Sequence, residues 1–148
     1  MMKRVVILFC LALVAATKSE KSPGEALRER VKEFNQAWIK EDYAVAARCV
    51  NPDLLEAAGE DKIKDKLREF MTTLKGGAAA YRRKISGFNI RRVTIEKDNV
   101  NATVLVHFIT GEGGGNVNRR EFPCPQKWAL KDKTWYWGSS DPSQGKSQ

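Results

Sequence analysis

The sequence predicts an α+β fold in which N-terminal helices pack on an antiparallel sheet. Two changes of hydrophobic pattern support this prediction. Apolar residues recur at helical spacing as far as Gly76, and from Tyr81 onward they alternate with a period of two. Helices followed by strands are typical of α+β domains. The 148 residues are enough for one such domain with a continuous core.

Residues 1–16 have the plan of a cleavable secretory signal peptide. Lys3 and Arg4 form a basic start, and an unbroken apolar run from Val5 to Ala16 follows them. This run is shorter than the roughly 20 apolar residues of a membrane span. We therefore expect cleavage after Ala16, a secreted or periplasmic location, and no integral membrane segment after cleavage.

The expected domain covers residues 22–138 and begins with a helix. Ser22 is an N-cap, Pro23 suits the first helical position, and Glu25 completes a capping box. Apolar residues then recur at spacings of four, three and four, which predicts one buried stripe made of Leu27, Val31, Phe34 and Trp38.

Two further helices are expected before the strands. A shorter helical pattern runs from Tyr43 to Val50 and ends at Asn51-Pro52, and another helix runs from Asp61 to Gly76. The inward-facing residues expected in this last helix are Ile63, Leu67, Phe70, Met71 and Leu74. The segment around Leu54 and Leu55 is too short to assign, and one helical turn and a small edge strand are the two alternatives.

Strands are expected at residues 85–96, 100–109, 117–131 and 135–137. In the second of these, Val104, Val106 and Phe108 lie on one face and His107 lies on the other. Pro123 and Pro125 predict an edge position or a bulge in the third strand, because proline cannot donate to a sheet ladder. Residues 139–148 are rich in Ser, Gln and Gly and are expected to form a disordered tail.

The charge is moderately basic. The chain has 26 basic and 18 acidic residues, a net charge of +8 that falls to +6 when Lys3 and Arg4 are removed with the signal peptide. Basic clusters lie at residues 82–84, 91–92 and 119–120 on the expected strands. They could attract an anionic polymer or a membrane surface, or they could protect strand edges against aggregation. Nucleic acid does not match an exported destination, so no nucleic-acid partner is expected.

Two cysteines, Cys49 and Cys124, remain after removal of the signal peptide. In an oxidising compartment an even pair is first interpreted as a disulfide. Two separately buried thiols are the alternative, because the sequence does not show whether the two Cα atoms approach closely enough.

Several short stretches together resemble the NTF2-like (cystatin-like α+β) superfamily. They are Phe34 and Trp38 followed by Lys40-Glu41-Asp42-Tyr43, the run from Asn51 to Gly59, and the closing Trp128 and Trp135-Tyr136-Trp137. The resemblance covers roughly residues 25–138, and small exported members of this kind are common in bacteria. It implies a curved antiparallel sheet of about four to five strands that wraps around the first helix to form a cone.

The cone implied by this resemblance gives the candidate site residues. Trp38, Tyr43 and Trp128 could line its mouth and hold an aromatic or apolar ligand by stacking, although core packing explains the same residues. Enzymes of the superfamily place an Asp, His or Tyr toward the cavity, so His107, the only histidine, is the fourth candidate. No carboxylate is evidently paired with it, so no catalytic residue is assigned.

Other chemistries have no support in the sequence. One histidine and two distant cysteines do not have the ligand spacing of a zinc site. The glycine-rich run at 111–115 lacks the Lys and Ser/Thr of a phosphate-binding loop. No metal and no cofactor are expected.

The sequence thus favours a non-enzymatic exported binding or interaction domain, with a small-ligand pocket or a sheet-mediated dimer interface. The first alternative is a cavity enzyme of the isomerase or hydrolase kind that uses His107 with Tyr43 or Asp98. The second is a basic module that binds anionic polymers. The identity of the ligand or protein partner does not follow from the sequence.

Overall fold

The computed structural model describes residues 20–79, 85–111 and 119–138. In this part of the chain four helices precede four strands, so the predicted α+β class is confirmed. The expected signal peptide and C-terminal tail lie outside the described residues. In chain order the elements are α1 (Pro23–Ile39), α2 (Tyr43–Arg48), α3 (Pro52–Ala58), α4 (Glu60–Ala79), β1 (Ile85–Ile95), β2 (Asn101–Thr110), β3 (Arg120–Lys131) and β4 (Thr134–Trp137).

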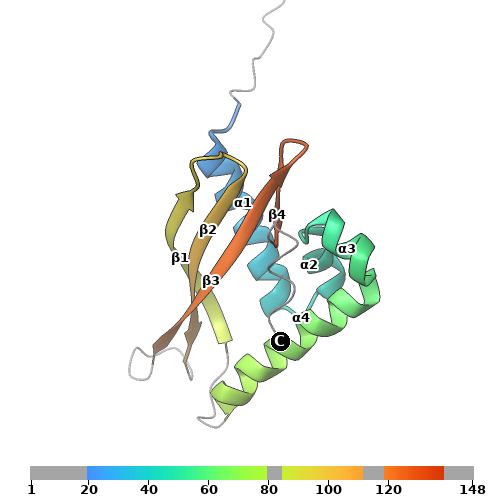
Figure 1. The fold of residues 1–148 in the computed structure, drawn as a ribbon. Coiled ribbons are helices and arrows are strands. Elements are labelled where there is room, and N and C mark those ends of the chain that lie inside the picture. Colours follow the sequence, from blue (N-terminus) through green and yellow to red (C-terminus); the bar gives the residue numbers. More distant parts are fainter. Residues whose placement is uncertain (1–19, 80–84, 112–118, 139–148) are drawn as a thin grey trace, which may run out of the picture.

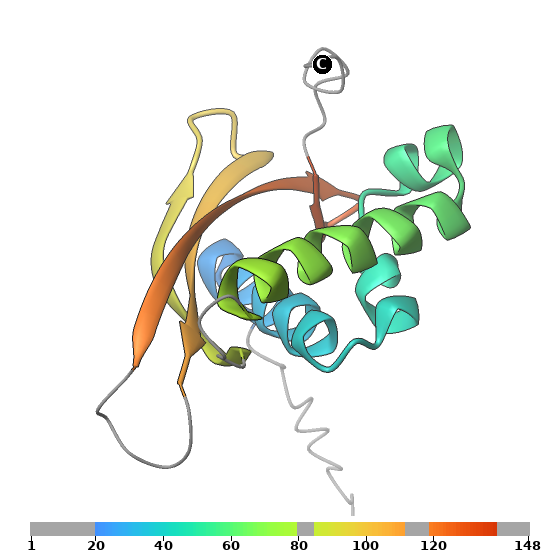
Figure 2. The same ribbon diagram turned by 90° about the horizontal axis from the view of Figure 1, so that it is seen from below.

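The strands form one antiparallel sheet in the order β1-β2-β3-β4. The sheet is curved and does not close into a barrel, and the helices lie on its concave side (Figure 1). Seen from below, β3 arches over the helices, with α1 and α4 beneath it (Figure 2). We call the face toward the helices the inner face and the opposite face the outer face.

The first helix begins and packs as predicted. The Glu25 N–H donates to Ser22 Oγ at 3.3 Å, and the Ser22 N–H donates to Glu25 Oε2 at 3.2 Å, which completes the capping box. The stripe of Leu27, Val31, Phe34 and Trp38 is buried. Because every residue of the stripe contacts the inner core, α1 is fixed against the sheet along its length.

The segment left unassigned in the sequence forms α3. The Asn51 side chain accepts a hydrogen bond from the Asp53 N–H at 3.0 Å, and Pro52 occupies the first helical position. Asn51-Pro52 therefore ends one helix and also starts the next. Gly59, with a φ of 85°, separates α3 from α4.

One predicted core residue of α4 is not in the core. Ile63, Leu67 and Met71 are buried as expected, but Phe70 is 44% exposed. Its ring stacks on Trp38 at a centroid distance of 5.0 Å. Phe70 therefore covers the edge of the core instead of filling it. The side chain of Leu74, also expected to face inward, lies outside the described part of the structure.

The alternation predicted for β2 is regular. Residues at even positions from Ala102 to Thr110 are buried on the inner face, and those at odd positions are half-buried on the outer face. On the inner face Phe108 of β2 contacts the Trp38 ring of α1 at a centroid distance of 5.8 Å. Phe34 of α1 contacts the rings of Trp38, Trp128 and Trp137 at centroid distances of 5.3, 5.7 and 5.4 Å. This aromatic cluster is the centre of the core.

The two prolines of β3 occupy an edge, as predicted. β3 lies between β2 and β4 in the sheet, but β4 pairs only with Trp128–Lys131. Pro123 and Pro125 precede this stretch, and among the described residues that side of the strand has no neighbour there. Their missing N–H groups therefore cost no ladder hydrogen bond to β4.

Candidate functional site

An apolar cavity of about 270 Å³ lies between α4 and β3, with α1 at its base. Its walls come from α1, α4, β3 and β4. Figure 2 shows α4 crossing the concave face of the sheet beside α1. Nearly all of the lining is apolar or aromatic: Trp38 from α1, Ile63, Lys66, Leu67 and Phe70 from α4, Cys124, Pro125 and Gln126 from β3, and Trp137 from β4.

The aromatic wall of the cavity is held in a fixed orientation. The Trp38 indole N–H donates to the carbonyl oxygen of Leu67 at 2.9 Å, which ties α1 to α4 inside the core. Phe70 then stacks on the Trp38 ring from the solvent side. An ordered indole beside a partly exposed phenyl ring gives the cavity a flat apolar surface for a planar ligand.

The polar wall of the cavity is satisfied internally. Gln126 Nε2 donates to Asn35 Oδ1 at 2.8 Å, and Asn35 Nδ2 donates to Gln126 Oε1 at 3.2 Å. Both side chains are buried, with exposed fractions of 0% for Asn35 and 2% for Gln126. Since Gln126 Oε1 also accepts from the Trp128 indole N–H at 3.4 Å, the amide has its partners in the protein and requires none from a ligand.

A charged cluster lies on the outer face of the sheet. Glu121 on β3 binds Arg91 of β1, lies 3.5 Å from Arg119 Nη2, and contacts His107 Nδ1 at 3.1 Å. The hydrogen bonds from Arg91 and then His107 lower the pKa of Glu121 from 4.5 to about 2, so its carboxyl stays ionised at neutral pH. The cluster links three strands across the outer face.

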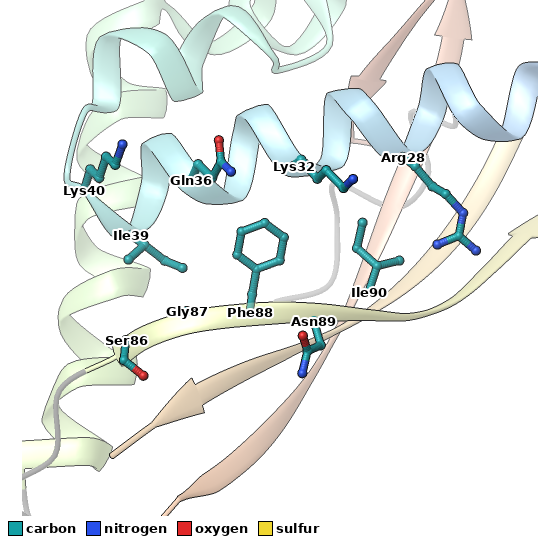
Figure 3. A pocket seen from close by; sticks show the side chains of 10 residues that line it. All are labelled: Arg28, Lys32, Gln36, Ile39, Lys40, Ser86, Gly87, Phe88, Asn89 and Ile90. Carbon is teal, nitrogen blue, oxygen red and sulfur yellow. The ribbon is translucent and has the colours of Figure 1, made fainter. Parts of the chain in front are cut away.

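A second groove, of about 600 Å³, lies between α1 and β1 (Figure 3). Its α1 wall carries Arg28, Lys32 and Lys40, and its β1 wall is the segment from Ser86 to Ile90. This groove is basic and shares no residue with the apolar cavity.

Comparison with known proteins identifies the fold. No family model and no curated protein matches the chain. A crystal structure from Campylobacter jejuni, of a protein named provisionally as an NTF2-like transpeptidase, matches with a TM-score of 0.52 at 17% identity and covers 75% of this chain and 95% of that chain. This chain has an NTF2-like fold. A solution structure of a SEC-C motif containing protein from Rhodopseudomonas palustris matches with a TM-score of 0.45 at 14% identity, over 80% of this chain and 76% of that chain.

The structure of this NTF2-like domain does not bring the four predicted ligand-binding residues together. Trp38 lines the cavity, but Trp128 is fully buried behind it against Phe34. Tyr43 starts α2, where the Arg68 guanidinium lies 5.2 Å from its ring centre. His107 lies on the outer face, because residues at odd positions of β2 point away from the helices.

His107 does have an acidic neighbour, Glu121, which the sequence did not reveal. The pair lies on the outer face of the sheet, whereas a cavity enzyme would need it inside a cavity. Glu121 lies on the neighbouring strand, and neither residue lines the apolar cavity or the groove beside α1. Asp98, the other acid considered, lies in the turn after β1 and is held by Asn101. His107 therefore stabilises the charged cluster on the outer face.

The two cysteines are free thiols in this structure, so the expected Cys49–Cys124 disulfide is not formed. Cys49 caps the end of α2, and its carbonyl accepts a hydrogen bond from the N–H of Trp137. Trp137 pairs with Trp128, and the four residues of β3 from Trp128 back to Cys124 span about 13 Å of strand. Burial raises the pKa of Cys49 to about 11 and also raises that of Cys124, so neither thiol is an activated nucleophile.

Most of the residues that form the cavity were not among the predicted site residues. The sequence pattern predicts Phe70 in the core and Trp137 in the last strand. It predicts Pro125 and Gln126 only as part of a strand that prolines interrupt. One sequence signal was available for the Gln126 region, namely a glutamine in a strand otherwise expected to face a core, which requires a buried partner.

None of the described helices is long and apolar enough to cross a membrane. Among the described residues there is also no cluster of three or more His, Cys, Asp or Glu side chains that could hold a metal ion.

Proposed function

We propose that this chain is an exported, non-enzymatic binding domain that holds a small neutral aromatic ligand in the cavity beside α4. The observation that supports this proposal most directly is the apolar lining of the cavity around the ordered Trp38 ring. Export is supported by the signal-peptide pattern of residues 1–16.

The size of the cavity indicates the size of the ligand. An apolar protein cavity of about 150 Å³ accommodates benzene. The cavity here measures about 270 Å³, which leaves room for a bicyclic ring system such as indole or naphthalene. The same comparison excludes a steroid or a long acyl chain as a fully enclosed ligand.

The lining also indicates the charge of the ligand. The polar groups at its inner wall, Gln126 and Cys124, are engaged with each other and with Asn35. An anionic or cationic ring buried there would have no counter-ion and would lose its hydration. Lys66 is exposed at the rim, so a polar substituent of the ligand is expected to point outward past this residue.

Fluorine NMR with 5-fluoroindole tests the proposal. The probe is titrated with the protein expressed from its full coding sequence, and we expect a saturable shift and broadening of the fluorine signal. An Ile63→Phe variant fills the cavity and is expected to weaken binding at least tenfold. Ile109→Phe, the same substitution on the outer face of β2, is the matched control and is expected to bind as the wild type does.

Two results would contradict the proposal. One is the absence of a saturable shift with the folded wild-type protein. The other is equal binding by Ile63→Phe and the wild type, since the probe would then bind elsewhere. Near-ultraviolet circular dichroism of each variant establishes that its aromatic core is intact.

The outer face of the sheet supports a second candidate function, association of two copies of the chain. No described helix covers this face, and Leu105 and Ile109 lie half-buried on either side of His107. Two such faces can pair through these apolar side chains. Light scattering after size exclusion tests this: a dimeric wild type that becomes monomeric in Leu105→Arg supports association, and a monomeric wild type at micromolar concentration rejects it.

A further inference from the structure

The groove between α1 and β1 carries regularly spaced cations on its helical wall. Arg28, Lys32, Gln36 and Lys40 follow one another at intervals of four residues along α1, and all four line the groove (Figure 3). Four residues of α-helix correspond to a rise of about 6 Å. The wall therefore presents two adjacent cations, an amide and a third cation along about 18 Å.

These cations are not neutralised by the protein. Within the part of the chain that the structure describes, Arg28, Lys32 and Lys40 form no ion pair with a carboxylate, and no carboxylate lines the groove. Two acids of α1 are engaged by other cations, because Glu29 binds Lys21 and Glu33 binds Arg30 at 2.8 Å. Together with Asp42 they border a neighbouring hollow that Lys32 and Lys40 also line, but none of them lines the groove itself. The groove thus has a positive potential that an anionic partner would complement.

The opposite wall is an open sheet edge. β1 is the first strand of the sheet and pairs only with β2 among the described residues. The other edge is different, because Val50 forms a bridge to Trp137 of β4 and both backbone hydrogen bonds of Trp137 are used. Among the described residues, the backbone N–H and C=O groups along the free edge of β1 are available to an added strand.

The side chains of β1 define how an added strand would lie. Phe88 and Ile90 point toward α1, and Ser86 and Asn89 point away from it (Figure 3). In the ladder with β2, register shifts at Ile85/Gly87 and Ile90/Arg92 delimit one regular stretch, Gly87–Ile90, and this stretch lines the groove. Every second side chain of an added strand would therefore enter the groove beside Phe88 and Ile90 and face the cations of α1.

The spacing of the two walls agrees. Alternate residues of a strand are separated by about 6.6 to 6.8 Å, close to the rise of about 6 Å from each wall residue of the helix to the next, from Arg28 through Lys32 and Gln36 to Lys40. We propose that the groove binds an extended acidic peptide, which adds to the free edge of β1 and directs alternate side chains to these wall residues, with carboxylates at Arg28, Lys32 and Lys40. The aliphatic part of each acidic side chain then packs on Phe88 and Ile90.

A second copy of this chain does not fit the groove in the same way. β1 itself carries Arg92, and pairing of two such edges, each beside the cations of its own α1, would bring like charges together. The charge of the edge thus opposes self-pairing and favours an acidic partner. This proposal does not depend on the ligand proposed for the apolar cavity, since the two sites share no residue.

Fluorescence anisotropy with a labelled peptide tests this proposal. The probe is fluorescein-labelled (Glu-Thr)₄ with a blocked C-terminus, because threonine favours strands and keeps the peptide soluble. We expect saturable binding to the protein expressed from its full coding sequence, and no binding of the uncharged (Gln-Thr)₄. Reversal of one groove charge in Lys32→Glu is expected to weaken binding about fivefold or more.

Two controls separate strand addition from attraction by charge alone. Lys62→Glu, the same charge reversal on the exposed surface of α4, is expected to change the affinity less than about twofold. A (Glu-Thr)₄ peptide N-methylated at its third and sixth residues keeps its charge but has one N–H blocked on each edge, so it is expected to bind at least tenfold more weakly.

Three outcomes would overturn the proposal. They are no saturable binding of (Glu-Thr)₄, equal loss of affinity in Lys32→Glu and Lys62→Glu, and undiminished binding of the N-methylated peptide. The last outcome would assign the groove to linear polyanions in general. Far-ultraviolet circular dichroism excludes unfolding of either variant as the cause of weak binding.

Discussion

Replacement of Gln126 by leucine tests whether the buried amide pair supports the wall of the apolar cavity. In the wild type, Gln126 Nε2 donates to Asn35 Oδ1 at 2.8 Å, and Gln126 Oε1 accepts from Asn35 Nδ2 and from the Trp128 indole N–H. Leucine has a similar volume but no polar atom. Gln126→Leu therefore leaves Asn35 Oδ1 and Trp128 Nε1 buried without a partner.

The expected cost follows from these two groups. Each buried polar group without a partner costs about 1–3 kcal/mol, so the two together cost roughly 2–6 kcal/mol. The additional apolar surface of leucine returns about 1–2 kcal/mol. The midpoints of these two ranges differ by about 2.5 kcal/mol, so we expect Gln126→Leu to lower the free energy of unfolding by about this amount, against a total of about 5–15 kcal/mol for a typical domain.

A double-mutant cycle with Asn35→Leu isolates the amide pair. Unfolding in urea is measured for the wild type, both single variants and the double variant. Because the double variant removes both amides, we expect its destabilisation to be at least about 1 kcal/mol smaller than the sum of the two single effects. Additive effects, or a Gln126→Leu variant within about 0.5 kcal/mol of the wild type, would refute this reasoning.

Three further predictions concern the rest of the domain. Folding lowers the pKa of Glu121 from 4.5 to about 2, so the ionised carboxyl stabilises the folded state fully above pH 4.5, and this stabilisation is lost as the pH falls toward 2. The urea midpoint of Glu121→Gln should therefore depend less on pH over this range than that of the wild type. Gly138→Ala should cost about 1–2 kcal/mol in thermal unfolding, because φ is +113° and the added Cβ would lie 2.5 Å from Leu54 Cδ1. In the native protein, maleimide should label Cys124 before the fully buried Cys49. If peptide mass spectrometry finds neither cysteine labelled even in denaturant, the two residues are not free thiols.

The sequence was sufficient for the parts of the fold that local patterns determine. The capping box at Ser22 and the buried stripe of α1 follow from side chains within one turn of each other. The period of two in β2 is equally local. α3 was missed because Asn51-Pro52 was interpreted only as a helix end, although the same residues are a strong helix start.

The site depends on contacts between distant segments, and these could not be derived from one sequence. Trp38 and Trp128 have equally apolar surroundings in the sequence, yet only Trp38 lines the cavity, because α4 crosses beside it and leaves Phe70 at the rim. His107 and Glu121 meet only through the register of β2 with β3. Local periodicity says which face a residue occupies but not what covers that face.

A crystal structure of the protein with 5-bromoindole would show whether the cavity holds an aromatic ligand, because bromine can be located by its anomalous signal. We expect a bromine peak between α4 and β3, in contact with Ile63, Phe70 or Trp137, with the indole ring against Trp38. A cavity filled by its own side chains, or a peak only outside these walls, would contradict this expectation.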